Sequence, residues 1–136
     1  MSRAKELRSW IVNIGMVLTE NWASDWTVCK EDRQLSQKLI PIFECFLGSL
    51  LEKGVSKRTS RRHEGACHAL GGYIVGEVFG RGDVSFSPNE TGETVLLRFI
   101  DDSGGPLVYQ DEEAWQNELD ATCRKLFKQL KNRKTI

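Results

Sequence analysis

The chain has 136 residues, of which 40% are hydrophobic and 28% are charged. This composition is typical of one globular domain with a real core, and it excludes a disordered protein. The 19 basic and 19 acidic residues cancel, which argues against a protein that binds polyanions over its whole surface, so any nucleic-acid site has to be local.

The first predicted element is an amphipathic helix over residues 2–21, in which apolar side chains recur at helical spacing. Trp22 and Trp26 follow it in a predicted turn. Because Trp is enriched both in cores and at protein interfaces, these side chains either cap the core or contact a partner, and capping is the favoured interpretation.

Targeting and metal-binding signals are missing from the sequence. The chain begins at Met1 without the apolar run of a signal peptide, and no segment approaches the roughly 18 apolar residues of a membrane span. The four cysteines and two histidines show no zinc-ligand spacing. We therefore expect a cytoplasmic protein with reduced thiols, no metal, no cofactor and no membrane partner.

A second apolar stripe runs from Asp32 to Leu50 and predicts the central core helix. Pro41 lies inside this stripe. Since proline lacks an amide hydrogen and disfavours helical geometry in the preceding residue, either the helix kinks at Pro41 or a second helix starts there.

The segment Lys53-Gly54-Val55-Ser56 predicts a reversal between two helices, because Gly54 is free to adopt a left-handed cap and Ser56 can accept from the next amides. The helix expected from Ser56 carries four cations in its first two turns: Lys57, Arg58, Arg61 and Arg62. Helix stability does not explain them, since like charges repel at i,i+4 and the helix dipole disfavours cations at this end. A phosphate backbone would explain them. The alternative is a solvated basic face.

The same helix contains Gly65, Gly71 and Gly72, and each costs about 1 kcal/mol relative to Ala in a helix interior. Close approach of another helix at Gly71 and Gly72 would offset this cost, and a helix break there is the alternative. His63 is expected to be a half-buried packing residue, because a general base needs an acid and a nucleophile that the sequence does not place.

Residues 83–86 and 93–100 flank a segment with turn chemistry and are rich in strand-forming residues, so they predict a two-stranded β-hairpin. Both faces of the second strand are partly apolar, and an isolated ribbon is marginal. The hairpin must therefore pack on helices or pair with another chain, which makes Val95 and Leu97 candidate interface residues beside Trp22 and Trp26. In a DNA-binding protein it would be a wing.

Asp101 and Asp102 head an acidic, glycine-rich segment that lacks the ligand spacing of a calcium loop, so it predicts a turn. Residues 111–133 predict the last helix, with Asp111 as N-cap and basic residues from Lys128 onward that complement the helix dipole. This basic end would join the residue 57–62 cluster if the fold brought the two together.

The central stretch resembles a known family. The residues concerned are Phe46-Leu47, Leu50-Leu51, Glu52 to Ser56, Thr59, His63 and the later Gly-Gly pair. They are similar to the helical core-binding (SAM-like) domain of tyrosine recombinases, the phage-integrase family, in which one helix ends in a similar turn before the next begins. A helix-turn-helix with residues 57–70 as recognition helix is the competing interpretation.

Two later stretches, Asp101 to Leu107 and Thr122 to Leu126, are similar to small stand-alone uncharacterised bacterial proteins with the same central turn. That resemblance brings no known activity. Recombinase activity is not implied either, because Tyr73 and Tyr109 match no nucleophile motif and the catalytic Arg and His constellation is missing.

The sequence thus predicts an α+β, mainly α fold of four to five helices in a single domain over residues 1–136. Its parts are a helical section 1–80, a β-hairpin and loop 81–110, and a C-terminal helix 111–133. With no phosphate-cradling glycine motif, activated nucleophile or metal set, we expect a non-enzymatic protein.

Two hypotheses for its function follow. The first is a DNA-binding module that uses the four cations of residues 57–62. The second is a protein-interaction or self-assembling module, such as a homodimer, which contacts its partner through the hairpin and the two tryptophans and serves, for example, in a mobile element or a toxin–antitoxin pair. Steep salt dependence is expected only of the first.

Overall fold

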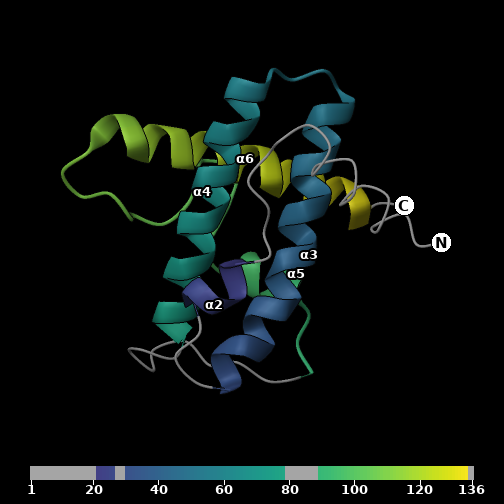
Figure 1. The fold of residues 1–136 in the computed structure, drawn as a ribbon, viewed down its shortest axis with the longest axis vertical. Coiled ribbons are helices and arrows are strands. Elements are labelled where there is room, and N and C mark those ends of the chain that lie inside the picture. The colour runs from purple at the N-terminus through teal and green to yellow at the C-terminus, as the bar shows by residue number, and fades with distance from the viewer. Residues whose placement is uncertain (1–20, 27–29, 79–88, 135–136) are drawn as a thin grey trace.

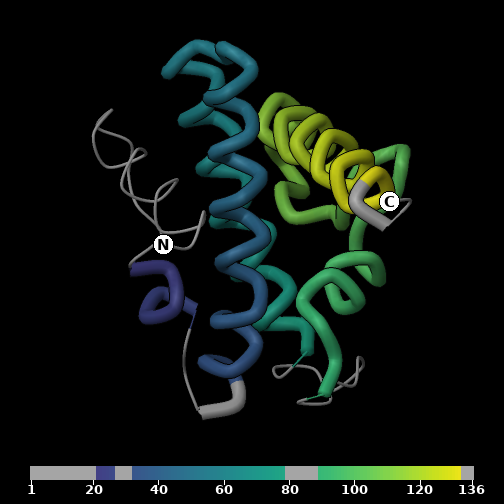
Figure 2. Tube along the Cα trace, turned by 90° about the vertical axis from the view of Figure 1, so that its right-hand side faces the viewer, coloured from purple at the N-terminus to yellow at the C-terminus, as the bar shows by residue number. Residues whose placement is uncertain are grey.

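The computed structural model of the protein describes residues 21–26, 30–78 and 89–134. These residues form five helices: α2 (Trp22–Trp26), α3 (Lys30–Glu52), α4 (Lys57–Gly76), α5 (Gly92–Leu96) and α6 (Glu113–Lys134). The long helices α3 and α4 run antiparallel, α2 packs on their lower halves, and α6 crosses α4 (Figures 1 and 2). The first predicted helix lies outside the described residues, apart from Asn21.

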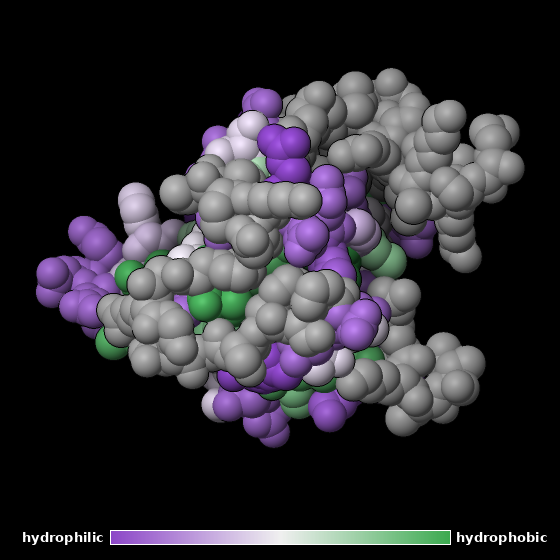
Figure 3. Space-filling view, turned by 90° about the horizontal axis from the view of Figure 1, so that it is seen from below, coloured by the Kyte–Doolittle hydropathy of each residue, from purple (hydrophilic) through white to green (hydrophobic). Residues whose placement is uncertain are grey.

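Helix α3 is the central core helix, as the apolar stripe predicts. Its fully buried side chains recur at i, i+4 and i+3 spacing and are those of Leu35, Leu39, Phe43, Phe46 and Leu47. Pro41 lies within this helix, faces solvent and does not divide it. Viewed from the end at which α3 begins, some hydrophobic side chains of the described residues show between polar ones (Figure 3).

The turn between α3 and α4 confirms the predicted caps. Gly54 has a φ of 83°, and the Val55 amide donates to the Leu50 carbonyl oxygen at 3.1 Å, which closes the end of α3. Ser56 is the N-cap of α4, and its hydroxyl oxygen accepts from the Thr59 amide at 3.2 Å.

Close approach at Gly71 and Gly72 is also confirmed, and α4 continues through both residues to Gly76. The indole of Trp26 lies so near that a Cβ added at Gly71 would be 2.2 Å from the ring, and one at Gly72 would be 3.2 Å from it. Trp22 and Trp26 are 3% and 7% exposed and pack against the ring of Phe43. Both tryptophans therefore belong to the core.

The predicted β-hairpin is wrong where the structure can test it. Residues 92–96 form helix α5 and residues 97–99 form a turn, while the first predicted strand, residues 83–86, lies outside the described residues. Nor is there a β-strand anywhere else in residues 21–26, 30–78 or 89–134, so the fold is all-α over this part of the chain, not α+β.

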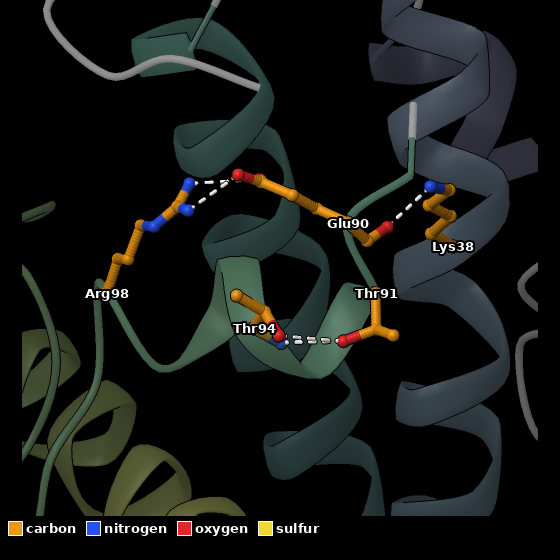
Figure 4. Close-up of polar contacts among 5 residues, drawn as sticks. All are labelled: Lys38, Glu90, Thr91, Thr94 and Arg98. Atoms are coloured by element: carbon orange, nitrogen blue, oxygen red, sulfur yellow. Dashed lines mark hydrogen bonds and ion pairs between the residues drawn. The ribbon is translucent and has the colours of Figure 1, made fainter. Parts of the chain in front are cut away.

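Packing explains why this strand-like sequence is helical. Val95 and Leu96 are neighbours and both are fully buried; in a strand they would point to opposite faces, whereas one side of a short helix can bury both. Thr91 caps α5 through a hydrogen bond from the Thr94 amide (Figure 4). Gly92 lies so close to α3 that an added Cβ would be 2.4 Å from the Lys38 carbonyl oxygen.

The segment before α5 is held by Glu90 (Figure 4). The Arg98 guanidinium donates to both carboxylate oxygens of Glu90, at 2.7 and 3.1 Å, and the Lys38 ammonium donates to its backbone carbonyl oxygen. Glu90 thereby links the two ends of α5 to α3.

A turn at Asp101 and a loop tied to α6 complete the fold. The Asp101 carboxylate accepts from the amides of Ser103 and Gly104 and from the Ser103 hydroxyl, so this segment is a turn, as predicted. These hydrogen bonds lower the Asp101 pKa. Helix α6 begins at Glu113, two residues after the predicted N-cap Asp111, because the Glu112 carbonyl oxygen accepts its first hydrogen bond, from Gln116.

Gln116 fastens the loop to α6 with one side chain. Its amide oxygen accepts from the Val108 and Tyr109 amides at 3.0 and 2.9 Å, and its amide nitrogen donates to the Pro106 carbonyl oxygen at 2.9 Å.

None of the described helices has the length and hydropathy that are required to cross a membrane.

Candidate nucleic-acid interface

The four predicted basic residues Lys57, Arg58, Arg61 and Arg62 occupy the first two turns of α4, and all are exposed. We call these four residues the basic cluster. Arg62 has an ion pair with Glu118 of α6 at 3.6 Å, in which both side chains are about half exposed. Such a surface pair contributes at most about 1 kcal/mol, so it does not prevent Arg62 from binding another anion.

His63 holds Lys125 of α6 next to the basic cluster through a hydrogen bond. The His63 Nδ1 donates to the Thr122 hydroxyl oxygen at 2.6 Å, since that hydroxyl already donates to the Glu118 carbonyl oxygen. The other ring nitrogen, Nε2, accepts from the Lys125 ammonium at 3.1 Å. Burial and the nearby Lys125 charge lower the His63 pKa to about 4. His63 is therefore neutral, is more deeply buried than the half-buried packing residue that was expected, and holds a fifth cation beside α4.

The basic C-terminal end of α6 does not join the basic cluster. Gln129 contacts Ser49 of α3 at 2.9 Å, so the C-terminal half of α6 passes beside α3 and away from the start of α4 (Figures 1 and 2). The Lys131 ammonium lies over the Phe127 ring of the same helix, at 5.4 Å from its centroid.

An exposed aromatic pair lies beside the arginines, and the sequence reasoning missed it. Trp115 is 58% exposed, and Tyr109 meets it edge-on, with ring centroids 5.4 Å apart. Together with Arg61 and Arg62 these rings line a pocket of about 200 Å³, which Gly65 and Glu118 help to form. Trp115 lies at helical spacing from Leu119, Cys123 and Leu126, which are buried, so spacing alone gives no sign that Trp115 is exposed.

A larger pocket of about 560 Å³ lies on another side of α4, toward α2. Glu64 lines it, is 5% exposed and has a carboxylate oxygen, Oε1, that finds no hydrogen-bond partner within the described chain. Burial raises the Glu64 pKa to about 7, against a smaller opposing effect of Arg61. At the edge of the same pocket, His68 pairs with Asp25 at 2.9 Å.

The predicted interface residues do not gather on the surface. Trp22, Trp26 and Val95 are buried in the core, and Leu97 is partly buried against it. The large hydrophobic side chains exposed in the described regions are those of Leu107, which is 60% exposed, and Trp115.

Metal and thiol chemistry find little support in the described residues. These residues contain no group of three His, Cys, Asp or Glu side chains close enough to hold a metal ion. Cys67 and Cys123 are buried, and burial raises the pKa of Cys67 well above its usual range and that of Cys123 to about 12. Because the thiolate is the reactive form, both are poor nucleophiles.

Comparison of the chain with protein-family models, with curated proteins and with solved structures found no match.

Proposed function

We propose that the protein is a non-enzymatic module that binds DNA at the start of α4. The observation that carries this proposal is the shared pocket of Arg61, Arg62 and Trp115. Cations that neutralise phosphates and an exposed ring on which a base can stack are the two components of single-stranded nucleic-acid sites. The resemblance of the central turn to the recombinase core-binding domain favours DNA over other polyanions.

The electrostatics support a local site on a neutral protein. Lys57 and Arg58 have no ion pair with another described residue and are exposed. Lys125, held by His63, adds a charge on the α6 side. With about four phosphate contacts, DNA affinity should fall roughly 50- to 150-fold between 50 and 200 mM salt.

The test is the fluorescence anisotropy of labelled single-stranded and duplex DNA of random sequence, titrated with protein at several salt concentrations. Arg58→Glu should weaken binding about tenfold or more at low salt and reduce the salt slope by about 1 to 2. The matched control is Arg33→Glu, an exposed arginine in the first turn of α3, at the opposite end of the molecule (Figure 1). Equal losses in both variants, or no binding at low salt, would rule the proposal out.

A protein contact is the second candidate, favoured by the exposure of Leu107 and Trp115 near the start of α6. If this surface binds a partner or a second copy, light scattering should show an assembly that persists in high salt, because apolar burial does not weaken as salt rises. Leu107→Ser should dissociate that assembly, whereas Arg58→Glu should leave it intact. If the Leu107→Ser variant instead binds single-stranded DNA tightly, the exposed ring of Trp115 belongs to the DNA site.

A further inference from the structure

The pocket between α2 and α4 has the dimensions of a small-molecule site. Its volume of about 560 Å³ lies within the roughly 300 to 1,000 Å³ typical of ligand pockets. One wall comes from α2 and the other from α4, and the two helices pack against each other at the lower end of the molecule (Figure 1).

Glu64 lines this pocket and has a buried carboxylate oxygen without a partner. Glu64 is 5% exposed, yet its Oε1 atom receives no hydrogen bond from the described residues. Leaving a buried polar atom unpaired is unfavourable, and an unpaired carboxylate is more so. A donor that enters the pocket would complete the hydrogen bonding of Glu64.

The second carboxylate of the pocket is already engaged. Asp25 accepts from His68 at 2.9 Å, and the His68 ring packs beside two indoles, with centroids 5.5 Å from Trp22 and 5.8 Å from Trp26. Trp22 and His68 therefore give the pocket a largely fixed wall of rings. Such a wall favours a flat ligand.

Gly65 keeps the wall open where a side chain would project. A Cβ added there meets nothing within 4 Å, so the absence of a side chain is not required by packing within the described part of the molecule. Because Gly costs about 1 kcal/mol relative to Ala in a helix interior, its use here calls for another explanation. Room for a bound molecule supplies one.

We propose that this pocket binds a small flat molecule that carries an amidine, guanidine or amino group. Its N–H groups donate to the Glu64 carboxylate, and its ring packs against the partly exposed ring of His68, with the buried Trp22 behind it. Arg61 also lines the pocket, but it is exposed, so water and salt screen its charge more than that of the buried Glu64. The site is separate from the proposed DNA site apart from Arg61 and Gly65, and it does not depend on DNA binding.

The probe is benzamidine, a flat ring with two donor nitrogens, and its control is benzoate, which has a similar shape and presents acceptors instead. Titration at pH 8, followed by chemical shifts of the backbone amides, should show saturable millimolar binding of benzamidine at residues around Glu64. Benzoate should bind at least about tenfold more weakly, because its carboxylate faces another carboxylate.

Three variants decide the assignment. Glu64→Gln keeps the shape and removes the charge, so it should weaken benzamidine binding about tenfold. Gly65→Leu should fill the pocket and abolish binding. Gly76→Leu is its matched control, because Gly76 also lies in α4 with open space around it, and it should bind like the wild type.

The proposal is overturned if benzamidine fails to saturate at millimolar concentrations, if benzoate binds equally well, or if Glu64→Gln leaves the affinity unchanged. Gly65→Leu replaces glycine with a better helix former, and circular dichroism should confirm that it is folded. DNA binding, tested through Arg58, can fail or succeed independently of each of these results.

Discussion

His63 and Glu64 are adjacent residues of α4 whose titrations affect stability in opposite directions. Burial lowers the His63 pKa from 6.5 to about 4 and raises the Glu64 pKa from 4.5 to about 7. The neutral His63 thus contributes stability above pH 6.5, which is lost as the pH falls through 4. The protonated Glu64 contributes stability below pH 4.5, which is lost as the pH rises through 7.

We expect the two effects to oppose each other between pH 4.5 and 6.5 and the Glu64 effect to be the larger at higher pH. The free energy of unfolding should fall by less than about 1 kcal/mol from pH 6.5 to 8 in the wild type, because Glu64 loses its proton near pH 7 and the last part of the His63 effect opposes this loss. In Glu64→Gln this fall should disappear, and the remaining His63 effect should make stability rise from pH 5 to 7. Urea unfolding at each pH measures both, and a Glu64→Gln profile that matches the wild type would contradict the assignment.

Single residues with strong backbone roles could be predicted from the sequence. Gly54 and Ser56 are predictable as caps because capping depends only on the local backbone and side-chain chemistry. The pair Gly71-Gly72 implies a close neighbour because glycine is unfavourable in a helix interior. The unpaired oxygen of Glu64 could not be predicted in this way. It depends on the packing of α2 against α4, which brings Asp25 and His68 together across 43 residues of sequence.

At the scale of elements, α3, α4 and α6 follow from helical periodicity, whereas α5 does not. Val, Thr, Phe and Ile favour strands by propensity, and the turn chemistry before residues 93–100 suggested a hairpin. What decides the structure is distant in the sequence: Gly92 fits against the Lys38 carbonyl oxygen and Val95 fills the core. Tertiary packing thus overrides local preference in this segment.

Gly92→Ala tests the fit of α5 against α3. Its Cβ would lie 2.4 Å from the Lys38 carbonyl oxygen and 2.8 Å from an Ile42 methyl group, so the two helices must move apart. We expect a loss of about 1 to 3 kcal/mol in the free energy of unfolding, measured with urea. Gly65→Ala, which meets no atom within 4 Å, is the control and should gain about 0.5 to 1 kcal/mol. Equal effects of the two changes would refute the close contact.

For the molecule as a whole, the tryptophans divide between the core and the surface. Trp26 packs against Phe43 of α3 and against Gly71 and Gly72 of α4, so it joins three helices. The side chain of Trp115 projects from α6 into solvent, where the Tyr109 ring contacts it edge-on. The sequence suggested a core role for Trp22 and Trp26 from their type. It gave no reason to separate Trp115 from the buried residues of α6, because exposure depends on where α6 crosses α4.

Trp26→Ala should lower the free energy of unfolding by about 3 to 5 kcal/mol, since it removes a buried side chain and leaves a cavity between α2 and α4. Trp115→Ala is the matched control and should change it by less than about 1 kcal/mol, while weakening single-stranded DNA binding by about 1 to 3 kcal/mol if a base stacks on the ring. Thermal unfolding and the anisotropy titration measure the two effects. Similar losses of stability in both variants would mean that the core does not depend on Trp26 as described.

The attachment of the loop before α6 has a consequence for local opening. Two loop amides and one loop carbonyl are satisfied by the single side chain of Gln116, so rotation of that one side chain releases all three together. The protection of the Val108 and Tyr109 amides against exchange with solvent is then set by the rotamer equilibrium of Gln116 and not by global unfolding. Tyr109 would leave Trp115 in the same step, and the exposed ring would lose its edge-on partner while the helices stay folded.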